Sequence, residues 1–229
     1  MSFQDIGYVS KVSGVLSPRQ YVSTFIDGDD FMLTPVTAED YVITQSSAGT
    51  AALDASAENG VILLDCASST VVQGIQMQRT SAQFKPKAGR EIYFECRLKV
   101  ADSATGPQFF AGLAEVDTTI IAASAVSTAN HIAFTSISTD NILLANAEKG
   151  GVGDTTTGTT LVEATYVVLG IKVSGLDKIT YYVDGVAVSE IDTTANVPIV
   201  ALAPSFVCQS SGTTDPIVHL DYWICQQTR

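Results

Sequence analysis

Residues 91–100 alternate between apolar and polar side chains, and this alternation constrains the fold more than any other feature of the sequence. One set of side chains is Ile92, Phe94, Cys96, Leu98 and Val100, and the other is Glu91, Tyr93, Glu95, Arg97 and Lys99. A period of two puts successive side chains on opposite faces of a strand, so that one face is buried and the other solvated. Residues 166–173 repeat the pattern, and no segment carries a sustained helical stripe. The sequence therefore predicts an all-β protein.

The dipeptide Asp184-Gly185 predicts a hairpin. Ile179, Tyr181 and Val183 alternate up to it, and Val186 and Val188 resume on the same face. Asp-Gly between alternating hydrophobics is a strong hairpin signal, because a type I′ turn needs a positive φ at both positions. Similar short β-rich runs continue from residue 31 onward, at the spacing typical of antiparallel sandwiches. We expect residues 25–229 to form one two-sheet antiparallel β-sandwich. Its expected core includes Ile92, Phe94, Leu98, Leu169, Ile171, Tyr181 and Val183.

Two other segments give more specific expectations. The run 218–225 sets Val218, Leu220, Tyr222 and Ile224 against a second face that carries Trp223, which predicts that this second face is also covered. Residues 51–59 predict one or two helical turns. The four cysteines, at positions 66, 96, 208 and 225, are far apart and lie in apolar segments, which predicts buried free thiols rather than a zinc site.

The charge of the chain argues against two classes of partner. Twelve basic and twenty-four acidic residues give a net charge of −12, whereas nucleic acids and anionic membranes attract basic surfaces. The beginning of the chain resembles no secretory signal, and no apolar run is long enough to span a bilayer. We expect the protein to mature in a reducing cytoplasm. Charged residues are few (16%) and are replaced by Ser and Thr, which suggests that much of the exterior is not meant to stay free in water.

Two pairs of carboxylates are candidates for a glycosidase site. Glu115-Val116-Asp117 begins like the Glu-x-Asp-x-(x)-Glu strand of retaining β-glucanases, which need two carboxyl groups about 5–5.5 Å apart. Thr118, Thr119 and Ile120 stand where the third carboxylate is expected, and Glu190-Ile191-Asp192 lacks it as well. These acids are therefore interpreted as residues at strand ends.

Other catalytic and binding motifs are also absent from the sequence. Neither His131 nor His219 accompanies a nucleophile elbow, and the glycines at 150, 151 and 153 lack the Lys-Ser/Thr of a phosphate loop. The run 27–30 (Asp-Gly-Asp-Asp) lacks EF-hand spacing and is interpreted as a surface turn. The sequence predicts that the chain is not an enzyme and holds no cofactor and no metal.

Residues 1–24 differ from the rest of the chain. They carry Lys11 and Arg19 against Asp5 alone, so this stretch is slightly basic on an acidic protein. It is either a frayed terminus or an arm that docks on a neighbouring subunit or a shell. The residues expected to make such contacts are Phe3, Ile6, Tyr8, Val9, Lys11, Leu16 and Arg19.

Three segments resemble a known group of proteins. Residues 92–102 and 109–118 (IYFECRLKVAD and FFAGLAEVDT) resemble the "FEaRvKlsD … fFvGLa … DT" core of tailed-phage structural proteins. Residues 179–188 (ITYYVDGVAV) resemble the hairpin that these proteins share with concanavalin A-like (laminin-G-like) jelly rolls, and residues 220–224 (LDYWI) resemble their final strand. The resemblance covers residues 90–229. Tyr166 departs from it, because relatives often carry Trp there.

The resemblance implies a jelly-roll fold and a phage virion structural protein. The implied role is that of a capsid decoration (cement) protein, which binds the major capsid protein on the head surface after assembly in the host cytoplasm. A homo-oligomer is expected, and a trimer would suit a three-fold axis of the capsid. The alternative is a lectin-like module of a fibre or tail that binds a glycan or receptor. A glycosidase is the third class.

Overall fold

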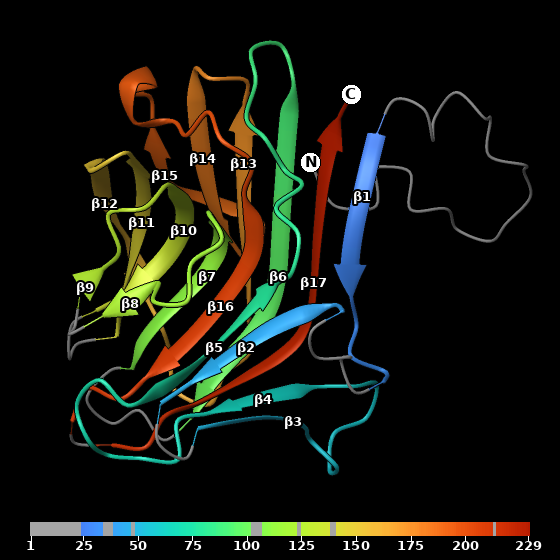
Figure 1. Ribbon diagram of the computed structural model, residues 1–229, viewed down its shortest axis with the longest axis vertical. Helices are drawn as coiled ribbons and strands as arrows, with labels where there is room; N and C mark the ends of the chain where they lie inside the picture. Colours follow the sequence, from blue (N-terminus) through green and yellow to red (C-terminus); the bar gives the residue numbers. More distant parts are fainter. Residues whose placement is uncertain are drawn as a thin grey trace, which may run out of the picture.

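The computed structural model describes residues 24–33, 39–46, 49–101, 107–122, 125–137, 141–212 and 214–229. Two antiparallel sheets pack face to face (Figure 1), and the predicted all-β antiparallel sandwich is confirmed. The predicted arm, residues 1–24, lies outside the described residues except for Thr24, and so do all seven of its expected contact residues.

The eight-stranded sheet has the order β15-β14-β13-β6-β17-β4-β3, with β1 paired to β17. Its strands are β1 (Thr24–Asp29), β3 (Thr50–Leu53), β4 (Ile62–Asp65), β6 (Glu91–Ala101), β13 (Val167–Ser174), β14 (Lys178–Val183), β15 (Val186–Ile191) and β17 (Ile217–Thr228). The seven-stranded sheet has the order β12-β11-β10-β7-β16-β5-β2. Its strands are β2 (Tyr41–Gln45), β5 (Gly74–Arg79), β7 (Gln108–Ala114), β10 (His131–Ser136), β11 (Ile142–Lys149), β12 (Val152–Thr160) and β16 (Ala203–Gln209). A short pair, β8 (Ile121–Ala122) and β9 (Ala125–Val126), lies between β7 and β10 in the chain, and a 3-10 turn (Thr194–Asn196) follows β15.

The core lies between the two sheets. Six of the seven residues predicted for it are buried, and Val183 is partly buried against the same cluster. All four cysteines are buried free thiols, as predicted. Asp184 and Gly185 have φ angles of 49° and 78°, which confirms the predicted hairpin turn. Val186 pairs directly with Val183, but it follows the turn in the edge strand and is 65% exposed.

Strand β17 corrects the expectation for Trp223. The pairing of β17 with β6 shifts register between Leu220 and Tyr222. A bulge of this kind inserts one residue, so side chains beyond it change faces. Val218 and Leu220 therefore face the core before the bulge, and Trp223 faces it afterwards with 1% of its surface exposed. Uniform alternation placed Trp223 on the wrong face.

Two other segments differ from their expected structure. The alanine-rich stretch expected to be helical begins with β3, which pairs with β4, because tertiary pairing outweighs the weak helix propensity of a short segment. Residues 27–29 of the Asp-rich run are part of β1 instead of a surface turn, and Asp30 follows the strand. Asp27 accepts hydrogen bonds from Arg79 Nε and Nη2, both at 3.0 Å, and Asp29 accepts one from the Tyr41 hydroxyl at 2.9 Å. No helix in the described part of the chain is long and apolar enough to cross a membrane.

Candidate functional site

The outer face of the seven-stranded sheet is covered by the chain itself. Residues 115–122, which follow β7, lie over this face, and β8 contacts β7. Ile120 and Ile121 pack on Phe110, Ala133 and Val207, which the sheet presents from β7, β10 and β16. These side chains form a second, smaller apolar cluster outside the main core. We call residues 115–122 the covering segment.

Two glutamines of β5 fix the covering segment to the sheet. The Gln78 amide nitrogen donates to the Glu115 carbonyl at 3.1 Å, and its amide oxygen accepts from the Asp117 backbone N–H at 3.1 Å. Gln76, two residues earlier in β5, makes the same kind of contact: its amide nitrogen donates to the Asp117 carbonyl, and its amide oxygen accepts from the Ile120 N–H at 3.0 Å. An amide side chain offers both a donor and an acceptor, so each glutamine satisfies backbone groups as a neighbouring strand would. The segment is thus held by neutral hydrogen bonds.

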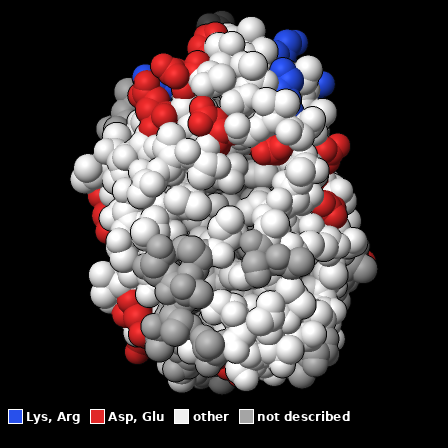
Figure 2. Space-filling view, turned by 90° about the vertical axis from the view of Figure 1, so that its left-hand side faces the viewer, with Lys and Arg blue, Asp and Glu red and all other residues white. Residues whose placement is uncertain are grey.

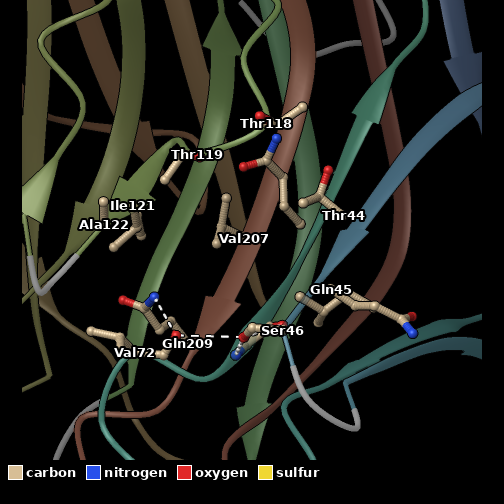
Figure 3. Close-up of a pocket in the computed structure, with 13 residues that line it drawn as sticks. Thr44, Gln45, Ser46, Val72, Thr118, Thr119, Ile121, Ala122, Val207 and Gln209 are labelled. Carbon is tan, nitrogen blue, oxygen red and sulfur yellow. Dashed lines mark hydrogen bonds between the residues drawn. The ribbon is translucent and has the colours of Figure 1, made fainter.

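A pocket of about 320 Å³ remains where the covering segment meets β2, β5 and β16. In Figure 3, Thr119, Ile121 and Ala122 lie on the left of the pocket and Thr44 and Gln45 on the right, with Val207 between them. Thr118 lies at the upper end, and Val72, Gln209 and Ser46 lie at the lower end. Gly74, Ile75 and Gln76 complete the lining. Most polar groups in this lining are hydroxyls and amides, and none of the side chains is charged.

Gln209 is the most informative side chain of this pocket. It is 6% exposed, and its amide nitrogen donates to the Val72 carbonyl at 3.2 Å (Figure 3). Its amide oxygen is buried and has no hydrogen-bond partner. A buried polar atom without a partner costs about 1–3 kcal/mol. Several described side chains have such an atom, and Gln209 is the one among them that lines this pocket.

The carboxylates considered as catalytic residues are occupied by local hydrogen bonds. Asn130 donates to Glu115 Oε2 at 2.8 Å, and Asp117 accepts from the Ser127 hydroxyl at 3.1 Å and the Thr119 N–H at 2.9 Å. Both acids therefore shape the loop that crosses the sheet. The other candidate acid, Glu190, lies in β15 and pairs with Lys178 at 3.0 Å. The structure does not bring these two groups of acids together, because β15 belongs to the opposite sheet.

The two histidines occupy different environments. His131 is buried on the covered face, where Nδ1 donates to the Ala129 carbonyl at 2.9 Å and Nε2 lies 3.1 Å from the Asn146 side-chain oxygen. Desolvation lowers the pKa of His131 more than these hydrogen bonds raise it. His219 Nδ1 lies 3.7 Å from Asp54. Within the described ranges, no group of three or more His, Cys, Asp or Glu side chains could hold a metal ion.

The outer face of the eight-stranded sheet has a different chemistry. The hydroxyls of Tyr93 and Tyr222 donate to the two oxygens of Glu95, at 2.6 and 2.9 Å. Gly170 makes room for this arrangement, since a Cβ there would lie 3.1 Å from the Tyr93 hydroxyl. Lys172 pairs with Glu91 at 2.9 Å beside a pocket of about 420 Å³ that Tyr93, Tyr182 and Gln226 also line. Aromatic rings and charges therefore gather on this face.

A third region is poor in charge. Figure 2 shows the side where β9 and β12 lie, with most charged side chains at its upper end and along its rims and few in its broad middle. Strand β12 carries five threonines and one aspartate, and Thr155, Thr157 and Thr160 are exposed; Val152 at its start is 60% exposed. Exposed threonines therefore contribute to this charge-poor flank.

The sequence analysis missed Gln76, Gln78 and Gln209. A signal for the first two was present, because glutamines at every second position of an otherwise apolar strand (GIQMQR) indicate one face that is buried against polar groups. No such signal marks Gln209, whose significance depends on the neighbouring turn at Val72.

Comparison with solved structures identifies the fold. An endo-1,3-beta-glucanase from Streptomyces sioyaensis superposes with a TM-score of 0.61 at 15% identity, covering 94% of this chain and 99% of that chain. Peanut lectin gives 0.61 at 14% identity, covering 90% and 97%. The Emp47p carbohydrate recognition domain gives 0.61 at 8% identity, also covering 90% and 97%. The fold is a concanavalin A-like jelly roll, as the resemblance implied. No protein-family model and no curated protein matches the chain.

The glucanase contradicts the prediction that the chain is not an enzyme. That prediction treated catalytic carboxylates as a local motif, whereas residues far apart in the sequence meet on one face of a sandwich. At these identities the likeness shows the fold alone. The exclusion of glycosidase activity is therefore withdrawn.

Proposed function

We propose that this chain is a lectin-like module that binds a carbohydrate in the pocket beside the covering segment. The observation that carries the proposal is the unpartnered amide oxygen of Gln209 in a pocket lined by hydroxyls and amides. The likeness in fold to a lectin and a carbohydrate recognition domain supports it.

The chemistry of the lining suits a sugar. A pyranose ring carries hydroxyl groups that both donate and accept hydrogen bonds, and its C–H faces are apolar. Binding sites of this kind combine an apolar floor with a few fixed polar groups. Here Val207 and Ile121 supply apolar surface, and Thr44, Ser46 and Thr118 supply hydroxyls. A neutral glycan fits better than an acidic one, because the lining offers no positive charge.

Gln209 gives the proposal its energetic basis. A sugar hydroxyl that donates to the Gln209 amide oxygen would satisfy a group that the free protein leaves unpaired. Satisfying a buried acceptor recovers about 1–3 kcal/mol, which corresponds to roughly a tenfold to hundredfold gain in affinity. Because this oxygen has almost no exposed surface in the free protein, the amide must turn toward the pocket to meet the sugar, and the loss of its bond to Val72 offsets part of the gain.

The test is calorimetric titration with soluble β-glucans and a panel of neutral oligosaccharides. Gln209→Ala should weaken the binding of a recognised sugar about tenfold. Gln226→Ala, which removes an amide on the opposite sheet, is the matched control and should leave the affinity unchanged. The proposal is wrong if no glycan binds, or if both variants lose affinity equally.

The same incubations should be assayed for new reducing ends. Release of reducing sugar would extend the function from binding to hydrolysis. Variants Glu115→Gln and Asp117→Asn would then show whether either acid takes part, because each substitution keeps the side-chain shape while removing the carboxylate.

A second candidate is the virion role that the sequence resemblance implies. We propose it on the charge-poor flank of β12, which offers neutral hydroxyls and the exposed Val152 to a protein partner. In that role the chain would decorate phage heads as a homotrimer bound to the major capsid protein, after assembly in the host cytoplasm. Residues 1–24 would be the docking arm.

This second candidate is tested by co-sedimentation with phage heads and by the mass of the free protein in solution. Deletion of residues 1–20 should reduce decoration if the arm makes contacts. Retention of full affinity by the deletion variant would show that the arm plays no part. Failure of the intact chain to sediment with heads would remove the candidate.

A further inference from the structure

Cys66 and Cys208 bring their sulfur atoms together between the two sheets. Cys66 follows β4 of the eight-stranded sheet, and Cys208 lies in β16 of the seven-stranded sheet. Their Sγ atoms are 3.3 Å apart, and neither side chain has any exposed surface. An S–S bond is about 2.05 Å long, so closing the pair requires the sulfurs to approach by only about 1 Å.

A shared carbonyl helps to position the two residues. The Cys66 N–H and the Cys208 thiol both donate to the Pro216 carbonyl, each at 3.3 Å. Burial raises the pKa of the Cys208 thiol. The folded protein therefore holds the Cys208 thiol in its neutral form, in contact with the sulfur of Cys66. By contrast, Cys96 and Cys225 lie on neighbouring strands of one sheet, and no hydrogen bond joins them in the described structure.

We propose that Cys66 and Cys208 are an oxidative cross-linking site that forms a disulfide between the two sheets. The oxidant is a small peroxide. One thiol reacts with hydrogen peroxide to give a sulfenic acid and water, and the other thiol then displaces a second water to form the S–S bond. Two thiols lose two electrons and two protons, and one peroxide is reduced to two waters. The raised pKa keeps this reaction slow in the folded protein, because the thiolate is the reactive form.

The cross-link would act on both stability and the pocket. The two cysteines are 142 positions apart, and in the chain-entropy account long loops gain most from closure. Cys208 lies between Val207 and Gln209, so the bond would also anchor the strand that forms the pocket floor. The cross-linking site itself does not depend on the proposed carbohydrate binding.

The experiment uses the full chain, unfolded under reducing conditions and refolded with and without hydrogen peroxide. Free thiols are then alkylated, and the protein is digested without reductant for mass spectrometry. We expect a linked peptide pair containing Cys66 and Cys208, with Cys96 and Cys225 alkylated. The oxidised protein should unfold about 10 °C above the reduced protein, and reductant should reverse the shift.

Variants separate the pair from general oxidation. Cys208→Ala should lose both the linked peptide and the rise in unfolding temperature, and Cys225→Ala should keep both. If a variant fails to fold, the peptide map of the unaltered chain decides the question. Alkylation of all four cysteines after oxidative refolding, or linkage of Cys66 to another cysteine, would overturn the proposal.

Discussion

The two outer faces of the sandwich are built from opposite kinds of polar group. On the seven-stranded sheet, the neutral amides of Gln76 and Gln78 fix the covering segment to the face. On the eight-stranded sheet, the carboxylate of Glu95 is satisfied by two tyrosine hydroxyls. Both arrangements leave a polar side chain mostly buried and fully paired.

The two faces differ because different hydrogen-bonding groups lie against them. A covering backbone presents both N–H and C=O groups, and only an amide side chain can pair with both kinds. Tyrosine hydroxyls need only an acceptor, so a carboxylate serves. Burial, followed by this carboxylate, raises the pKa of both tyrosines. The neutral face should therefore respond most to loss of hydrogen bonds, and the charged face to pH.

The largest effect is expected from Gln78→Leu on the neutral face. Gln78 is 1% exposed and pairs with Glu115, Asp117 and the Ser205 hydroxyl, all of which lose a partner in the variant. The free energy of unfolding should fall by about 2–3 kcal/mol in urea titrations. Glu95→Gln, the counterpart on the other face, should cost less, because an amide oxygen still accepts from a tyrosine. An equal loss in both variants would contradict the comparison.

A smaller effect is expected at high pH on the charged face. Burial, followed by Glu95, raises the pKa of Tyr93 and of Tyr222 in the folded state. A raised pKa favours the neutral form in the folded protein, so its stabilisation is complete below the unfolded value near pH 10 and is lost as the pH rises above it. The free energy of unfolding should therefore fall between about pH 10 and pH 11, and Tyr93→Phe should make this fall smaller. The expected difference is roughly 1 kcal/mol or less, because Tyr93 is partly exposed and solvent weakens the effect.

Tyr182→Phe is the control for that measurement. It removes a hydroxyl that lines the same face but makes no hydrogen bond to Glu95 in the described structure. A change of slope as large in Tyr182→Phe as in Tyr93→Phe would show that Glu95 has no special part.

The smallest effect is expected at mildly acidic pH on the neutral face. Burial lowers the pKa of His131, so its stabilisation is present above the unfolded value near 6.5 and is lost as the pH falls below it. Glu148 is its cross-strand neighbour and has a raised pKa, which acts in the opposite sense at lower pH. Unfolding should therefore be compared between about pH 7 and pH 5.5. The free energy of unfolding should fall by up to about 1 kcal/mol over this interval, and His131→Gln should remove most of that fall. If His131→Gln leaves the fall unchanged, His131 is not its cause.

The sequence alone determined the sandwich and most of its central strands. Alternation in 91–100 and the Asp184-Gly185 turn are local features, because a period of two and a positive φ are properties of neighbouring residues. The burial of the four cysteines followed from the same apolar runs. The glutamines of β5 could also have been recognised from their alternation.

Only the tertiary structure decided the face of Trp223 and the identity of the pocket. One inserted residue in β17 reverses every side chain beyond it, and no local pattern marked the insertion. The pocket joins residues near 45, 72, 119 and 209, which are brought together by strand order. Cys66 and Cys208 meet for the same reason, across 142 positions and two sheets. Such contacts depend on how the sheets pack, which alternation within one strand does not encode.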